Sequence, residues 1–133
     1  MKAFFGHVGI NVSNPKKSFP FWKDMVTFLG YMIVDESAGH MGVAEGSKEK
    51  LCLTVTARKY RGAGYHRKQT GMTHLAFSVR SKKEVDEFTD KFLKPHKIRR
   101  LYDSPKAFPE YASRYYAVFF EDPDRIKIEV YCE

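Results

Sequence analysis

Three side chains in this sequence have the chemistry and spacing to bind one divalent metal: His7, His74 and Glu129. Each lies in a run where apolar and polar residues alternate, which predicts a strand with one face buried. Two imidazoles and one carboxylate on separate strands are typical of a facial triad, which leaves coordination positions open for a substrate. We therefore expect a divalent metal as cofactor. These ligands suit iron, manganese, zinc, nickel or cobalt and do not distinguish among them.

The two histidines hold equivalent places in an internal repeat. Residues 5–12, FGHVGINV, are echoed by residues 72–79, MTHLAFSV. Each segment is followed, after a similar interval, by a second alternating run, at 51–55 and at 126–130. Aligning apolar residues with apolar residues in those two runs matches Thr54 to Glu129. The chain is therefore predicted to contain one module twice.

Each module is predicted to fold as βαβββ within a single domain of residues 1–133. Module 1 spans about 1–57, a basic connecting loop about 58–70, and module 2 about 71–133. Capping signals place one helix from Asn14 to Gly30 and another from the capping box at 81–84 to Pro95. The predicted strands are 3–12, 31–37, 40–45, 50–56, 71–80, 98–102, 114–120 and 125–132.

The four long strands are predicted to have one apolar face and one small, polar face. We expect both helices to cover the apolar face, because their apolar stripes match it. The polar face carries the three candidate ligands and is too polar for a packed core. A cupped, partly wet cavity fits this face best.

Composition indicates a compact fold, since 43% of the residues are hydrophobic and 15% are aromatic. No apolar run is long enough for a membrane helix and the first residues do not form a signal sequence, so we expect a soluble, cytoplasmic protein. Cys52 and Cys132 are predicted to point to opposite faces of their strands, which argues against a disulfide.

The net charge is +7, and the Lys and Arg residues are scattered along the chain with one concentration in the loop at 58–70, where aromatic residues are interleaved. This pattern fits nucleic-acid binding or a basic rim that draws a small anion into a cleft. The sequence contains no helix-turn-helix or RNA-binding signature, so a small-molecule substrate is favoured. Exposed strand edges and an excess of aromatic residues predict a homodimer.

The segments around His7, His74 and Glu129, with the turn Asp122-Pro123-Asp124, resemble the vicinal oxygen chelate superfamily. That group includes glyoxalase I, extradiol dioxygenases, methylmalonyl-CoA epimerase, and fosfomycin- and bleomycin-resistance proteins. The resemblance spans nearly the whole chain. It implies an α+β fold in which two paired βαβββ modules form a cupped, incomplete mixed β-barrel with helices on the outer face. A divalent metal bound by the same three residues would lie in the cup.

The resemblance also implies a function: a metal-dependent lyase, isomerase or ring-cleaving dioxygenase. Its substrate would be small, anionic and chelated through vicinal oxygens. Glu129 is then a candidate catalytic residue as well as a ligand, and Tyr115 or Tyr131 could donate a hydrogen bond to the developing anion. The alternative is a metal-free protein of the bleomycin-resistance type, which sequesters its ligand in the same cup.

Three departures from family patterns bear on the branch. Thr54 falls where glyoxalase I usually has Glu and the epimerase Gln, which argues against strict glyoxalase I activity. Phe119 stands where fosfomycin-modifying enzymes are expected to have Tyr. Only His66 is available as a second catalytic histidine of the extradiol type, and a solvated loop histidine is the simpler interpretation.

Overall fold

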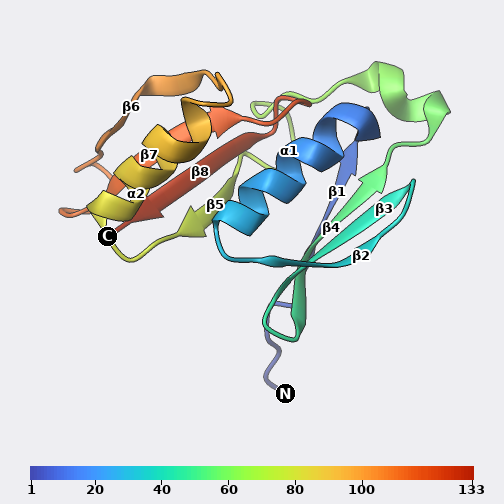
Figure 1. The fold of residues 1–133 in the computed structure, drawn as a ribbon, viewed down its shortest axis with the longest axis horizontal. Coiled ribbons are helices and arrows are strands. Elements are labelled where there is room, and N and C mark those ends of the chain that lie inside the picture. Colours follow the sequence, from blue (N-terminus) through green and yellow to red (C-terminus); the bar gives the residue numbers. More distant parts are fainter. The chain divides into compact units, whose positions relative to one another are not determined.

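The structure, a computed structural model, describes residues 1–133 and contains two four-stranded mixed sheets accompanied by helices (Figure 1). The chain divides into two compact units, Met1–Gly64 and Tyr65–Glu133. Each unit contains one sheet that does not close on itself. The predicted α+β fold of paired βαβββ modules is therefore confirmed.

Unit 1 has the strand order β1-β4-β3-β2, with β1 parallel to β4 and the other pairs antiparallel. The helix α1 begins as predicted, because the Asn14 side chain accepts a hydrogen bond from the Lys16 backbone N–H. The elements of unit 1 are β1 (Val8–Val12), α1 (Pro15–Phe28), β2 (Met32–Glu36), β3 (His40–Glu45), β4 (Lys48–Val55) and the 3₁₀ helix η1 (Arg58–Ala63).

Unit 2 repeats the plan with the order β5-β8-β7-β6, and β5 runs parallel to β8. Its helix begins at the predicted capping box, where the Ser81 side chain accepts a hydrogen bond from the Glu84 backbone N–H. The elements of unit 2 are β5 (Leu75–Ser78), α2 (Lys82–Phe88), the π-helical turn η2 (Thr89–Leu93), β6 (Arg100–Ala107), β7 (Tyr116–Glu121) and β8 (Lys127–Cys132).

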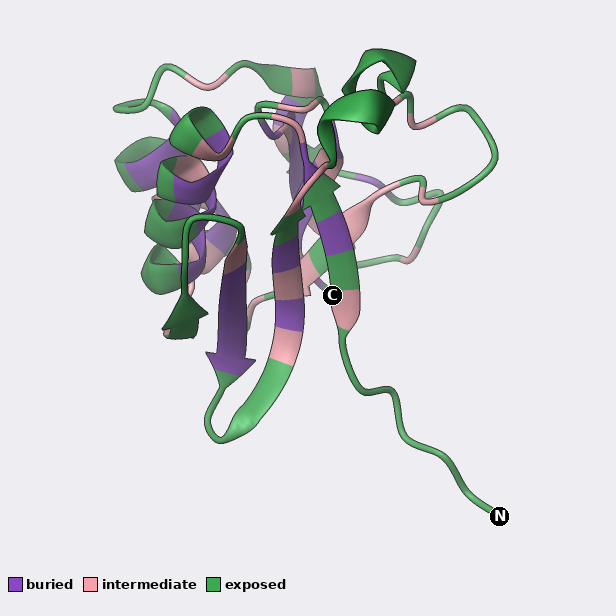
Figure 2. Ribbon diagram, turned by 90° about the vertical axis from the view of Figure 1, so that its right-hand side faces the viewer, coloured by how far each residue is buried: buried purple, intermediate pink, exposed green.

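The first strand of each unit is shorter than predicted. The segment expected at 3–12 forms a strand only over Val8–Val12, and the segment expected at 71–80 only over Leu75–Ser78. Pairing with β4 begins at Val8, so the residues before it have no partner strand in unit 1. Figure 2 shows them as an exposed extension. Both histidines therefore immediately precede their strands.

The sheet of unit 2 separates an aromatic helix-covered face from a second face. Helix α2 contacts β7 and β8, and the Phe88 ring lies 5.6 Å from the Phe120 ring and 5.1 Å from the Phe92 ring. On the other face, Phe108 and Phe119 are buried with Tyr115 and Tyr131 packed against them. This second face is the one that carries Glu129.

Alternation in unit 1 follows the prediction. On β4, Leu51 and Leu53 are buried while Thr54 is exposed, and on β1 Ile10 and Val12 are buried while Asn11 is exposed. Cys52 is half-buried in unit 1, Cys132 is buried in unit 2, and both are free thiols, as expected. None of the helices is long and apolar enough to cross a membrane.

Candidate functional site

Glu129 is a buried carboxylate at the centre of the β8 strand. Only 2% of the residue is exposed. In the sheet register it lies between Ala76 of β5 and Phe119 of β7. A carboxylate so far removed from water needs hydrogen bonds or a cation to offset its desolvation. Its two oxygens accordingly have different partners.

Tyr115 is the partner of the first oxygen. Its hydroxyl donates a hydrogen bond of 2.7 Å to Oε1 of Glu129. Burial, together with this hydrogen bond to a carboxylate, raises the pKa of Tyr115 above its ordinary value, so the phenol keeps its proton. The ring stacks on Tyr131 with centroids 4.9 Å apart and planes 11° from parallel. Tyr115 therefore holds Glu129 in place as a fixed donor.

His74 is the partner of the second oxygen. Its Nε2 lies 3.1 Å from Oε2 of Glu129, and its Nδ1 lies 3.0 Å from Oγ1 of Thr73. The His74 side chain is 35% exposed, so solvent reaches the imidazole from one side while the carboxylate stays buried. Unit 2 thus brings His74, Glu129, Tyr115 and Tyr131 into one cluster.

The face around this cluster is more aromatic than predicted. The sequence indicated a small and polar surface, and that holds for Ala76 and Ser78, which are exposed. Strand β7 adds Phe119, which is buried beside Glu129, and Lys127 lies over the Phe119 ring at 5.2 Å. The surroundings are therefore of low polarity, which strengthens electrostatic interactions at the carboxylate.

His7 has its own neighbours in unit 1. One ligand atom from each of His7, Glu49 and Cys52 lies within 4.8 Å of the other two. The Cys52 thiol donates a hydrogen bond of 2.8 Å to Oε1 of Glu49. Burial, and then this contact with a carboxylate, raises the pKa of Cys52 to about 11. The sequence did not point to Glu49 or Cys52 as parts of a site.

The register between strands explains why the sequence did not point to Cys52. Gly9, two residues after His7, pairs with Cys52, and Ala76, two residues after His74, pairs with Glu129. Cys52 is therefore the equivalent of Glu129 in the repeat, and the alignment that matched Thr54 to Glu129 is wrong by two residues. Thr54 is exposed and pairs with Asn11 and His40.

The cluster in unit 2 fits a divalent metal. Imidazole nitrogen and carboxylate oxygen are ligands that first-row metals accept. Two ligand atoms ~2.1 Å from a metal and at right angles lie ~3.0 Å apart, close to the observed separation of Nε2 and Oε2. Tyr115 occupies the other carboxylate oxygen and so directs one lone-pair side of Glu129 toward His74. The donor set of His74 and Glu129 therefore suits such an ion.

Two arginines of the basic loop, Arg61 and Arg67, are engaged in contacts with other residues. Arg67 forms an ion pair with Glu121, Arg61 donates to the carbonyl of Thr56 at 2.8 Å, and Tyr65 donates to the carbonyl of Met72. His66 is exposed, and its Nδ1 accepts from the Lys68 backbone N–H at 3.2 Å. Nothing in these contacts gives His66 a catalytic neighbour.

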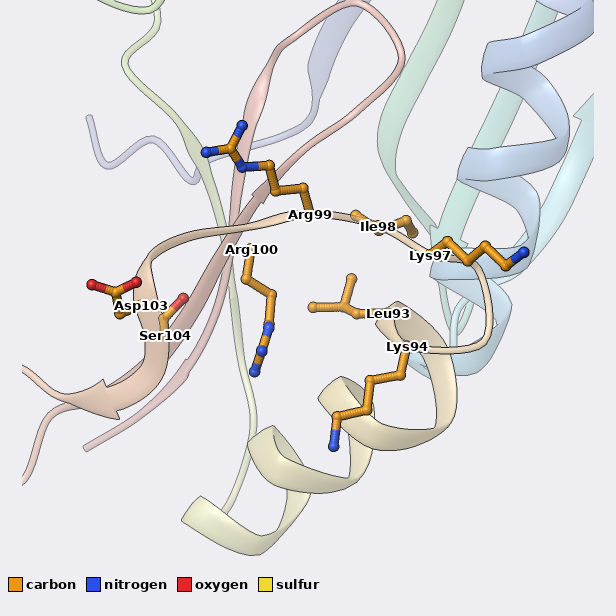
Figure 3. A pocket seen from close by; sticks show the side chains of 8 residues that line it. All are labelled: Leu93, Lys94, Lys97, Ile98, Arg99, Arg100, Asp103 and Ser104. Carbon is orange, nitrogen blue, oxygen red and sulfur yellow. The ribbon is translucent and has the colours of Figure 1, made fainter.

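A hollow of about 510 Å³ lies elsewhere in unit 2, between the end of η2 and the start of β6 (Figure 3). Its lining is basic, with Lys94, Lys97, Arg99 and Arg100, and its acidic member is Asp103. Lys94 is already paired with Asp90 at 2.6 Å. Neither His74 nor Glu129 lines this hollow, so it is a separate surface feature.

Comparison with known proteins points to one family. The model of the Glyoxalase/Bleomycin resistance protein/Dioxygenase superfamily matches residues 4–130. An uncharacterized protein of Bacillus subtilis, YqjT, is 35% identical over 126 residues, covering 93% of this chain and 94% of its own. A candidate glyoxalase from Bacillus halodurans has a TM-score of 0.88 and 34% identity, covering 99% of this chain and 97% of that one.

More distant structures share the fold. Lactoylglutathione lyase from Agrobacterium tumefaciens has a TM-score of 0.68 and 18% identity, covering 98% of this chain and 94% of that one. The fosfomycin resistance protein FosX from Listeria monocytogenes has a TM-score of 0.70 and 16% identity, covering 100% and 95%. At these identities the likeness shows the fold alone.

Proposed function

Because the chain belongs to the Glyoxalase/Bleomycin resistance protein/Dioxygenase superfamily, we propose that it is a divalent-metal-dependent enzyme acting on a small, anionic substrate. The observation that carries the proposal is the pair of His74 and buried Glu129, 3.1 Å apart, with Tyr115 on the opposite carboxylate oxygen. His7, the equivalent of His74 in the repeat, is proposed as the third ligand. The substrate would be chelated through two neighbouring oxygens.

A buried carboxylate at this place needs a reason. Burying an uncompensated carboxylate beside Phe119 and Tyr131 carries a desolvation penalty of roughly several kcal/mol. An apolar side chain at the same place would carry no such penalty. Pairing Glu129 with His74 on one oxygen and Tyr115 on the other offsets that cost and fixes the orientation of the carboxylate. This arrangement supports a role in binding a cation, because the two sides of the carboxylate are assigned to different partners.

Bound there, a divalent metal supplies Lewis acidity that stabilises negative charge on substrate oxygens. The residues of the chain do the rest. Tyr115 keeps its proton and holds Glu129, and the half-buried Tyr131 stacks against Tyr115, so that both phenols are positioned by packing. The aromatic face with Phe119 excludes water from the carboxylate. Proton transfer then falls to Glu129, and Tyr131 is the phenol left to donate a hydrogen bond to the developing anion, because the Tyr115 hydroxyl is engaged by Glu129.

The reaction type is proposed more broadly: a lyase or isomerase, or a ring-cleaving dioxygenase. Thr54 no longer bears on this choice, because the register assigns Cys52, not Thr54, as the equivalent of Glu129. A metal-free protein that sequesters its ligand is the second candidate. It is favoured by the hydrogen bond between Tyr115 and Glu129, which satisfies part of the carboxylate without any ion.

Metal removal and reloading tests the proposal. Protein stripped with chelator should be inactive both in an aldehyde–thiol isomerisation assay and in an anaerobically prepared Fe²⁺ catechol-cleavage assay. Reloading with iron, manganese, zinc, nickel or cobalt should restore turnover in one of them. Glu129→Gln keeps the shape of the side chain and removes its charge, so this variant should regain little turnover on reloading. Turnover that is indifferent to chelator would refute the metal dependence, and ligand binding that is indifferent to chelator, without turnover, would favour the sequestering protein.

A further inference from the structure

Unit 1 contains a ligand group whose composition differs from that of unit 2. Where unit 2 has Glu129, the register of unit 1 places Cys52. Both of its in-register neighbours are glycines: Gly9 on β1 and Gly42 on β3. Side-by-side residues on neighbouring strands share a face of the sheet. The Cys52 sulfur therefore has no bulky neighbour in register on its own face.

Gly42 leaves space that Glu49 uses. A Cβ atom placed on Gly42 would lie 2.9 Å from Oε2 of Glu49, closer than such atoms come, whereas a Cβ on Gly9 would meet nothing within 4 Å. The carboxylate of Glu49 can therefore lie over Gly42 and accept the Cys52 hydrogen bond from Sγ at 2.8 Å. One side of the sulfur is held by a carboxylate and the other side is open.

His7 completes the group. Its ligand atom lies within 4.8 Å of those of Glu49 and Cys52, and it is exposed, so its ring can turn. Zinc–sulfur and zinc–nitrogen distances of roughly 2.3 and 2.1 Å, at ligand–metal–ligand angles of roughly 90–110°, put ligand atoms roughly 3.1–3.6 Å apart. The observed spread is compatible with that after small rotations of exposed side chains.

We propose that Cys52 binds, as a thiolate, the metal that His7 binds, with Glu49 placed to take up the thiol proton. The inference rests on the proposed function only in assuming that His7 is a metal ligand. On binding, the S–H bond of Cys52 breaks, a sulfur–metal bond forms, and the proton leaves through the Glu49 carboxylate to solvent. A thiolate selects a softer ion, so zinc or cobalt is favoured over manganese.

Cobalt is the probe, because a thiolate bound to Co²⁺ gives an intense near-ultraviolet charge-transfer band that imidazole and carboxylate ligands do not give. Titrating the full chain with Co²⁺ under reducing conditions should produce this band. Cys52→Ser should abolish the band and weaken Co²⁺ binding by about tenfold or more, since losing a direct ligand costs at least as much as losing an outer-shell partner. Cys132→Ser, which removes the buried thiol of unit 2, should retain the band.

The outcomes separate the two proposals. Calorimetric binding of Co²⁺ without a charge-transfer band overturns the role of Cys52 and leaves the proposed function standing. No Co²⁺ binding at all overturns both. If the band is lost in Cys132→Ser but kept in Cys52→Ser, the sulfur ligand is Cys132 of unit 2, and the inference is overturned. Gly42→Ala leaves the proposed ligands His7 and Cys52 unchanged but should displace the Glu49 carboxylate. Co²⁺ binding should then weaken while the band survives, and unchanged affinity would remove Glu49 from the group.

Discussion

Replacing Tyr115 by Phe removes one hydroxyl and nothing else from the cluster in unit 2. The hydroxyl donates to a carboxylate that is 2% exposed, so Oε1 of Glu129 loses its donor in a place that water enters poorly. A hydrogen bond to a charged group contributes roughly 1.5–3 kcal/mol. Because Tyr115 is itself half-buried, we expect the lower part of that range, about 1.5 kcal/mol, as the loss in free energy of unfolding of the metal-free protein.

Metal affinity should fall as well. Outer-shell partners that orient a ligand are worth roughly 10–100-fold in affinity. Tyr115→Phe should therefore raise the dissociation constant for Mn²⁺ or Co²⁺ by roughly that factor. The matched control is Tyr111→Phe, since Tyr111 is exposed, touches the Tyr115 ring edge-on at 5.4 Å, and loses a hydroxyl of the same kind.

Urea unfolding in chelator and calorimetric metal titration measure the two effects separately. If Tyr115→Phe and Tyr111→Phe both match the parent in stability and affinity, the Tyr115 hydroxyl does not hold Glu129 in place. If stability falls but affinity does not, the hydrogen bond serves the fold alone.

Further predictions concern other contacts. Tyr116→Phe should lower the free energy of unfolding by about 1 kcal/mol at neutral pH, because the Tyr116 hydroxyl donates to Asp86 at 2.7 Å. Burial and Asp86 raise the pKa of Tyr116 in the folded state above its ordinary value of 10.0. The difference in free energy of unfolding between the parent and Tyr116→Phe should therefore shrink as the pH rises from 10 through the folded-state pKa. Urea titrations at several pH values measure it. The chain should form a dimer at micromolar concentration in sedimentation experiments, since β2 is an edge strand with Val34 54% exposed and Phe5 is 77% exposed. Val34→Lys, which puts a charge on that edge, should shift the equilibrium toward monomer, and a monomeric parent chain would refute the prediction.

Alternation of apolar and polar residues predicted much of the fold. It separated the buried Leu51 and Leu53 from the exposed Thr54, and the capping signals at Asn14 and Ser81 located both helix starts. It could not set the length of the first strands, because strand length depends on pairing, and pairing begins at Val8.

The same period of two explains the misplaced equivalent of Glu129. Sliding one strand by two residues keeps every side chain on its face, so aligning apolar residues cannot distinguish Thr54 from Cys52. Only the hydrogen-bonded register, in which Gly9 pairs with Cys52 as Ala76 pairs with Glu129, resolves it. Strand β7 is apolar on both faces, so its contribution of Phe119 to the site gave no alternating signal either.

The most direct test of a metal bound through Glu129 compares two alanine variants by calorimetric titration with Mn²⁺. The parent chain should bind the ion, Thr54→Ala should bind it nearly as well, and Glu129→Ala should lose most of its affinity, because only the second change removes a charged ligand. Circular dichroism confirms that each variant is folded. Equal affinities for the parent and a folded Glu129→Ala variant would contradict the account, as would a parent chain that binds no metal.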